Sequence, residues 1–407
     1  MSIVGSLSTD AGIRQLDDII SVVTSNQSEI EDAITELSLF FCRHFKTGLL
    51  PFSKSTKYPS PVQRQVYTFI DLKFKTLCNY LNNNNDYPKT EVFANAIFEL
   101  IKNDPDMSLI PTAANIFVEK EIIDETISKN PKFQNFVYEK LLENLDEKRN
   151  IAIDVLTKEF PDSERSNVFS ELFLKVSKME LTNDEIIHIF DNFESILHRV
   201  DDQLITFDFL NHNINKGPII ASMAIPYLVD VSLNRAIDVP DFYSFAFKAI
   251  SPESLSYKKR IKFFDMLSRV LSPKSLQSNI PIAFAVKLSR MLLEVSPDVQ
   301  LDILSLLQYL VRAHTCVEEL LEPKDLPLSN VNGSLSECKA QTLWEVRALQ
   351  NSPVNLISEA AKTLGQRRLP PEYCSFNLKS NVESCKTKTN STVRFNWADK
   401  LDKNIWD

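Results

Sequence analysis

Residue types that often carry chemistry are present in this chain, but their spacing does not match known catalytic or metal sites. The five histidines are scattered, and His188 and His198 stand too far apart to be neighbours on one helix face. None of the six cysteines belongs to a CxxC pair. The Asp201-Asp202 pair lacks the further oxygen ligands of a calcium or magnesium loop. Phosphate-binding and hydrolase motifs are missing as well. The sequence therefore predicts no catalytic residue, no metal and no cofactor, and a protein that is not an enzyme.

Positive charge is concentrated in one segment of an acidic chain. The net charge is −9, which argues against a general nucleic-acid binder. Residues 256–290, the basic segment, hold eight lysines and arginines against a single aspartate. Such a segment could bind a phosphate backbone or an acidic partner, or it could be the solvated face of two helices. The residues we select as candidate contacts are Lys258, Lys259, Arg260, Lys262, Arg269, Lys287 and Arg290.

Glycine content favours an all-α fold. The chain has only six glycines in 407 residues, against an average of about 7%. Glycine supplies the positive-φ positions of tight turns and phosphate-binding loops, which β and nucleotide-binding α/β folds use often. With 26 phenylalanines and many leucines and isoleucines, the chain is best interpreted as helices joined by Pro, Asn and Ser turns.

Two features predict a soluble intracellular protein. The first residues lack the basic region and apolar core of a signal peptide, and isolated cysteines are typical of a reducing compartment. The most apolar stretch, 218–233, is interrupted by Pro226 and carries Asp230, so we do not expect it to span a membrane.

Apolar residues recur every three or four positions through most of the chain, which predicts helices. In residues 28–45 this spacing forms a stripe from Ile30 to Phe45, with Ser28 as a possible cap. Pro61 and Pro297 suit first helical turns. Short breaks between helices favour antiparallel pairs stacked as an irregular HEAT/ARM-like α-solenoid. The further predicted helices are 61–81, 89–103, 113–128, 131–145, 147–158, 166–179, 183–199, 258–271, 281–295 and 297–314.

We divide the chain into three predicted regions: helical repeats over 1–215, a second helical domain over 216–365 and a polar tail over 366–407. The tail is rich in Lys, Ser, Thr and Asn and has little periodicity, which is typical of a segment without fixed structure. Its last residues include Phe395, Trp397 and Trp406. These aromatics could dock on a partner or fold back on the parent domain.

Five motifs in the second domain resemble a known family. They are Val239–Tyr243, Lys259–Phe264, Ala283–Arg290, His314–Cys316 and Leu343–Val346 followed by Leu349. In this order they resemble the conserved domain of the CCAAT-binding-factor/Mak-twenty-one (CBF/Mak21) family, and in particular its nucleolar complex protein four branch. A His-Tyr-His-Pro run that usually follows the last motif is replaced here by Gln350–Val354, so no role of those histidines carries over.

The aromatic residues of these motifs are most simply core residues, since burial of one aromatic side chain contributes roughly 1.5–3 kcal/mol. The motif residues that we expect in the core are Phe242, Tyr243, Phe263, Phe264, Trp344 and Leu349. The charged residues between them are the better candidates for contacts.

The resemblance implies a nuclear and nucleolar assembly factor of the small ribosomal subunit. Family members of this kind join the small-subunit processome, pair with nucleolar protein fourteen and support early processing of pre-ribosomal RNA without catalysing it. The alternatives are a cytoplasmic HEAT-like adaptor or transport receptor, and an enzyme of unrecognised type.

Overall fold

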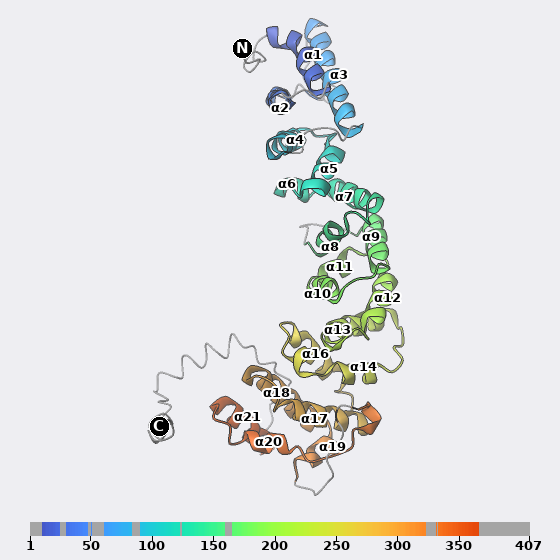
Figure 1. Ribbon diagram of the computed structural model, residues 1–407, viewed down its shortest axis with the longest axis vertical. Helices are drawn as coiled ribbons and strands as arrows, with labels where there is room; N and C mark the ends of the chain where they lie inside the picture. The colour runs from blue at the N-terminus through green and yellow to red at the C-terminus, as the bar shows by residue number, and fades with distance from the viewer. Residues whose placement is uncertain are drawn as a thin grey trace, which may run out of the picture. The chain divides into compact units, whose positions relative to one another are not determined.

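The computed structural model describes residues 10–24, 30–47, 61–83, 90–122, 124–158, 165–322 and 333–365, together with Leu50 and Val331 (Figure 1). These residues form α-helices and short 3₁₀ turns and contain no strand. The predicted all-α, solenoid-like fold is confirmed. Internal contacts divide the chain into two compact units, Met1–Thr206 and Phe207–Asp407, which are described separately.

The first unit is a succession of short and medium helices. In this unit α2 packs on α4, α5 on α7 and α7 on α9, as expected when antiparallel helix pairs are stacked. The helices are α1 (Asp10–Thr24), α2 (Ile30–Lys46), α3 (Pro61–Asn83), α4 (Glu91–Asn103), α5 (Ile110–Lys120), α6 (Glu125–Ser128), α7 (Pro131–Glu143), α8 (Arg149–Thr157), α9 (Asn167–Ser177), α10 (Asn183–Asp191) and α11 (Phe193–Arg199). The division between the units falls within α12 (Gln203–Asn213).

Polar caps start several of these helices, and aromatic rings fill the space between them. Thr182 and Glu185 form a reciprocal capping box on α10, and the Asn130 side chain caps α7. In the core, Tyr138 of α7 meets Phe169 of α9 edge-to-face, with ring centroids 5.2 Å apart. The first unit is therefore held chiefly by apolar and aromatic packing between helices that are near one another in the sequence.

The second unit is built around α18 (Pro297–Ala313), which packs on α16, α17, α19 and α21. Its leucines and isoleucines are buried on several sides, as a central helix requires. The other elements are α13 (Pro218–Arg235), α14 (Phe242–Ala249), α15 (Pro252–Leu255), α16 (Arg260–Val270), α17 (Asn279–Met291), α19 (Thr315–Glu318), η2 (Glu319–Leu321), η3 (Leu335–Glu337), α20 (Trp344–Leu349) and α21 (Asn355–Gly365).

Three helix predictions differ from the structure. The helix predicted over 113–128 is two helices, because Glu121 takes a left-handed conformation (φ 58°) that ends α5. The helix predicted over 183–199 is divided at Asn192, whose backbone is not helical. The stretch that we expected Pro226 to interrupt is one continuous helix, α13. Since α13 is buried on all sides around Pro226, packing outweighs the hydrogen bond that proline removes.

Some predictions concern residues outside the described ranges, and others concern domain boundaries that stay predictions. Ser28 and the tail from residue 366 onward lie outside the described residues. The boundaries predicted at residues 215 and 365 remain predictions, although Pro61 and Pro297 do begin α3 and α18.

Candidate nucleic-acid interface

The start of α16 gathers cations at a helix end where they are electrostatically unfavourable. Lys259 is the N-cap residue, Arg260 and Lys262 lie in the first turn, and no acidic residue occupies that turn. The N-terminal end of a helix carries partial positive charge, so these side chains repel it. This repulsion must be compensated, either by acidic residues of other elements or by a bound anion.

Arg260 is compensated inside the fold. Its Nη2 lies 2.7 Å from Oδ2 of Asp298, and its Nε lies 2.9 Å from Oδ2 of Asp302. Both acids come from α18, and Asp302 is 1% exposed. Arg260 therefore clamps α16 to α18, and its charge is used within the domain.

Three other cations lie on α16 or directly before it. Lys262 and Arg269 stand seven residues apart, which places them on the same face of the helix, and the exposed Lys258 lies in the turn before the N-cap residue Lys259. The Lys262 ammonium lies 3.9 Å from the ring centroid of Tyr227 on α13, and Lys258 lies 5.7 Å from that of Tyr257. Arg269 is exposed and pairs with Asp230 of α13 at 3.1 Å. This arrangement, which we call the α16 face, gathers cations of the kind that contact a phosphate backbone, while the Tyr227 ring beneath Lys262 is itself buried.

Lys287 is buried. Its Nζ donates to the Phe247 carbonyl at 2.6 Å and lies 4.3 Å from the centroid of the Phe247 ring. Burial lowers the pKa of Lys287 from its ordinary value to about 8. Lys287 therefore joins α17 to α14 and does not lie on the α16 face.

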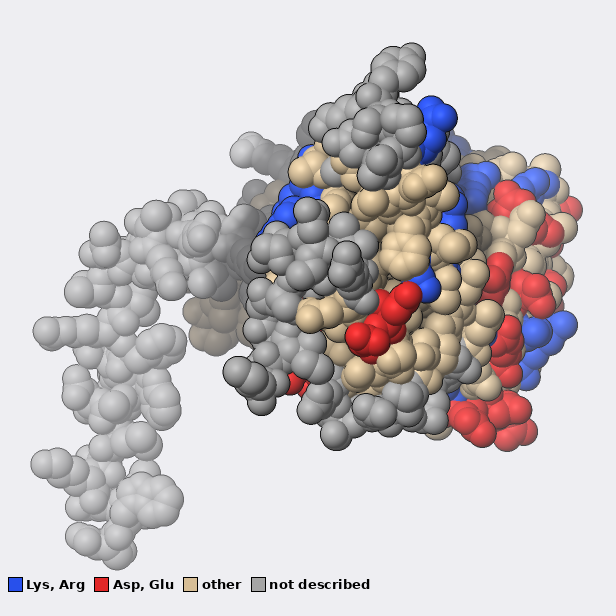
Figure 2. Space-filling model, turned by 90° about the horizontal axis from the view of Figure 1, so that it is seen from above, with Lys and Arg blue, Asp and Glu red and all other residues tan. Residues whose placement is uncertain are grey.

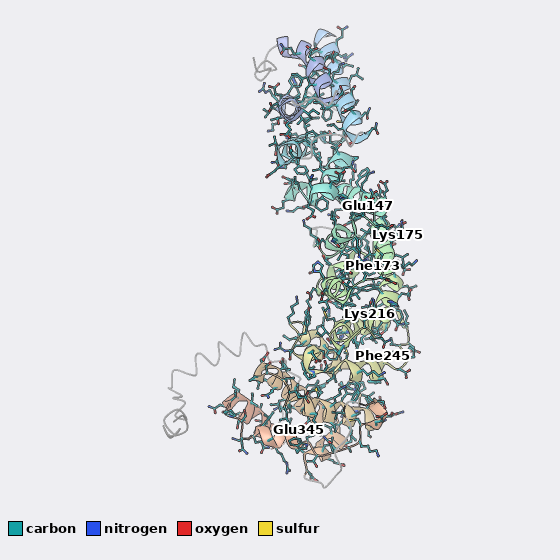
Figure 3. The ribbon with its side chains drawn as sticks, in the orientation of Figure 1. Glu147, Phe173, Lys175, Lys216, Phe245 and Glu345 are labelled. Atoms are coloured by element: carbon teal, nitrogen blue, oxygen red, sulfur yellow. The ribbon has the colours of Figure 1, made fainter. Side chains whose placement is uncertain are left out.

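Arg290 is held by a buried carboxylate. Its Nη1 lies 3.1 Å from Oε1 of Glu345, which is fully buried in α20 (Figure 3). Oε2 of Glu345 accepts a 2.7 Å hydrogen bond from Ser289. This cluster ties α17 to α20, so the guanidinium of Arg290 acts inside the unit.

Residues 218–361 match the model of the CBF/Mak21 family. The second unit carries a CBF/Mak21 domain. The matched range contains both buried clamps and the whole α16 face. The family is non-catalytic, is nuclear and nucleolar, and is associated with ribosome biogenesis. No curated protein matched the chain.

The family-motif residues of the CBF/Mak21 domain differ in burial. Phe263 and Phe264 are fully buried, whereas Phe242, Tyr243 and Leu349 are partly exposed. The expectation that Trp344 lies in the core is wrong, because its side chain is 40% exposed. The adjacent Glu345 and Val346 occupy the buried face of α20, and Arg290 lies 5.3 Å from the Trp344 ring centroid.

Sequence reasoning missed the acids that neutralise the basic segment. Asp298 and Asp302 stand four residues apart on a helix that is otherwise strongly apolar, and Glu345 follows the tryptophan of the last motif. An acid at an apolar helical position is itself a signal of a buried cationic partner. His314 was likewise unassigned, and its Nε2 lies 2.6 Å from the Leu271 carbonyl.

Among the described residues, no helix has the length and apolarity needed to cross a bilayer. The same part of the chain holds no group of three or more His, Cys, Asp or Glu side chains placed to bind a metal ion.

Proposed function

We propose that this chain is a non-catalytic assembly factor of the small ribosomal subunit, acting as a scaffold in the small-subunit processome in the nucleolus. The observation that carries the proposal is the CBF/Mak21 match over the residues that form the clamped helical domain. The order of the five motifs favours the nucleolar complex protein four branch of that family. In this role the domain holds partners and pre-ribosomal RNA in place while other factors process the RNA.

The α16 face, joined by Lys259 at the helix start, is the proposed RNA contact. Lys258 and Arg269 are exposed, and Lys262 lies over an aromatic ring. Contacts of this type bind phosphates without reading sequence and weaken as salt rises. Arg260, Lys287 and Arg290 are left out of the proposed contact because the fold uses their charges internally.

A nucleolar protein fourteen-like subunit is the proposed protein partner. The motif resemblance supports this pairing, and stacked helix pairs offer grooves that receive an amphipathic segment. Other processome proteins would join through the same scaffold.

Affinity purification of the tagged full-length chain, with mass spectrometry and RNA sequencing, tests the proposal. We expect precursors of the small-subunit RNA and processome proteins, including the partner subunit. Exclusion of the chain from the nucleolus and from pre-ribosomes would contradict the proposal. Recovery with cytoplasmic cargo would instead support the alternative of a HEAT-like adaptor or transport receptor.

A charge-matched pair of variants tests the α16 face within the same purification. Lys258→Gln/Lys259→Gln removes two charges from the proposed contact, and Lys248→Gln/Lys362→Gln removes two exposed charges elsewhere in the unit. We expect the first variant to recover several-fold less RNA with unchanged protein partners. Equal RNA recovery with both variants would show that the α16 face does not bind RNA.

A further inference from the structure

Ser296 is an exposed serine directly before the proline that begins α18. The described residues contain four Ser-Pro pairs, and the serines of the other three, Ser251, Ser272 and Ser352, are only partly exposed. Each of those three hydroxyls also accepts a hydrogen bond from the fold. The backbone of Ser296 is extended (φ −67°, ψ 157°), and its hydroxyl does not cap the helix. Of these serines, Ser296 is therefore the one presented to an enzyme in solution.

The hydroxyl of Ser296 is linked to the buried Arg260 clamp through one carboxylate. Ser296 Oγ donates to Oδ1 of Asp298 at 2.5 Å, and Oδ2 of the same carboxylate lies 2.7 Å from Nη2 of Arg260. The Arg260 side chain is 11% exposed and also contacts Asp302. A group added to Ser296 would thus lie one carboxylate away from a fixed guanidinium.

The proposed RNA contact begins next to this guanidinium. Lys258 and Lys259 directly precede Arg260, and the first turn of α16 has no acidic residue. Because Arg260 holds the first turn of α18, the starts of α16 and α18 lie together. Exposed charges interact over about 8 Å at physiological salt. A negative charge on Ser296 would therefore act on Arg260 and on the start of the α16 face.

One phosphate is a large change for the charge of this unit. Figure 2 shows acidic side chains gathered along one side of the visible face of the molecule, with basic ones interspersed. The second unit, by contrast, has a small positive excess, with 24 basic and 21 acidic residues in Phe207–Asp407. A phosphoserine carries roughly −1.5 to −2 charges at pH 7, so one phosphate would cancel about half or more of that excess.

We propose that a proline-directed protein kinase phosphorylates Ser296 and that the phosphate lowers the affinity of the α16 face for RNA. In this step Ser296 Oγ attacks the γ-phosphorus of ATP, the bond to the β–γ bridging oxygen breaks, ADP leaves, and the hydroxyl proton passes to a base of the kinase. Pro297 suits such a kinase because proline has no backbone N–H that docking would leave unpaired. The effect on RNA rests on the proposed function, whereas the modification itself does not.

Arg260 is the group that would hold the phosphate. Phosphate oxygens accept strong hydrogen bonds from a guanidinium, and the added charge would repel the carboxylate of Asp298. The N-terminal end of α18 carries partial positive charge, which also favours an anion at Ser296. Asp302, which is 1% exposed, keeps its contact with Nε of Arg260, so the domain stays folded. The phosphate then repels an RNA backbone that approaches Lys258 and Lys259.

Treatment of the full-length chain with a purified proline-directed kinase and ATP, followed by peptide mass spectrometry, tests the modification. We expect a phosphate on the peptide that contains Ser296 in the parent and in Ser352→Ala, which removes another Ser-Pro serine of the same unit. Ser296→Ala should lose that phosphate. A parent chain that the kinase leaves unmodified at Ser296 would overturn the inference.

Fluorescence anisotropy with a labelled single-stranded RNA of about 20 nucleotides, at about 0.1 M salt, tests the effect on binding. We expect the phosphorylated parent to bind roughly tenfold more weakly than the unmodified parent, and kinase-treated Ser296→Ala to bind like the unmodified parent. Ser296→Asp should reproduce part of the loss, whereas Ser352→Asp, which adds the same charge elsewhere in the unit, should not. Equal losses from the two aspartate variants would indicate a diffuse charge effect and would contradict the inference.

Failure of this inference can be told apart from failure of the proposed function. If the unmodified parent binds RNA and phosphate on Ser296 leaves the affinity unchanged, the RNA contact stands and the regulation is refuted. If the unmodified parent binds no RNA, the proposed RNA contact fails together with the effect of the phosphate on it. The mass spectrum decides in either case whether Ser296 is modified.

Discussion

The two units differ in the burial of their ion pairs. In the first unit, many ion pairs join residues three or four apart on exposed helices, as between Lys175 and Glu171. In the second unit, buried pairs join helices distant in sequence, as between Arg260 and Asp302 or Arg290 and Glu345. The first unit also holds the buried Arg199, which donates to the Leu156 carbonyl and joins α11 to α8, but the buried ion pairs that fix how helices pack lie in the second unit. A run of lysines and arginines in a sequence is therefore not by itself evidence of a basic surface.

The largest expected effect comes from breaking a buried clamp. Glu345→Ala leaves the guanidinium of Arg290 without its carboxylate, and loss of one partner of a buried pair typically costs about 3–5 kcal/mol. Urea unfolding followed by Trp344 fluorescence, with Trp397 and Trp406 replaced by Phe, would measure the free energy of unfolding of the second unit.

An exposed pair provides the control for that experiment. Glu171→Ala in the first unit removes the partner of Lys175, whose side chain is 47% exposed, and should change stability by about 0.5 kcal/mol or less. Circular dichroism would report this change, since no tryptophan lies in the first unit. If Glu345→Ala and Glu171→Ala lowered the free energy of unfolding by similar amounts, the contrast between the units would not hold.

Lys287 predicts a pH dependence for the stability of the second unit. Its pKa in the folded protein is about 8, below its ordinary value of 10.5, so folding releases a proton between these values. The second unit should therefore become more stable as pH rises from 8 toward 10, by on the order of 1–2 kcal/mol at pH 9. Comparison with Lys287→Met isolates this contribution, because that variant keeps the apolar stem without a titrating group. If the stability of the parent and that of Lys287→Met changed equally with pH, Lys287 would have no role in this dependence.

The smallest effect is expected at a helix cap of the first unit. Thr182→Ala removes the side-chain acceptor for the Glu185 N–H and should destabilise α10 by roughly 0.5–1 kcal/mol. Hydrogen exchange of the α10 amides would show faster opening there, while Thr182→Ser should exchange like the parent. Faster exchange throughout the second unit would mean that the two units do not open independently.

Helical periodicity predicted most of the fold because apolar spacing depends only on local geometry. Residues 297–313 show this best, since one stripe of leucines and isoleucines and a first-turn proline specify α18. The break at Glu121 was missed because that position carries none of the Gly, Asn or Pro residues that usually mark a helix end, and the break at Asn192 was missed because apolar residues keep a helical spacing from Ile186 to Leu197. At Pro226 the sequence predicted a break where the structure has a continuous helix, because tertiary packing outweighed the hydrogen bond that proline removes.

The candidate site was predicted only in part. The sequence placed Lys258, Lys262 and Arg269 in one segment, and the structure places Lys262 and Arg269 along one face of α16 with Lys258 in the turn before it. It could not show that Lys287 and Arg290 turn inward, because their partners, Phe247 and Glu345, lie some 40 and 55 residues away. Long-range pairing of this kind depends on the packing of helices, which spacing within a helix does not reveal.

Ultraviolet cross-linking of the tagged chain to RNA in cells, with identification of the cross-linked residues and sequencing of the attached RNA, tests the central claim most directly. We predict cross-links in the peptide that contains Tyr257 to Lys262, attached to precursors of the small-subunit RNA. Cross-links confined to the first unit, or RNA unrelated to the ribosome, would contradict the account.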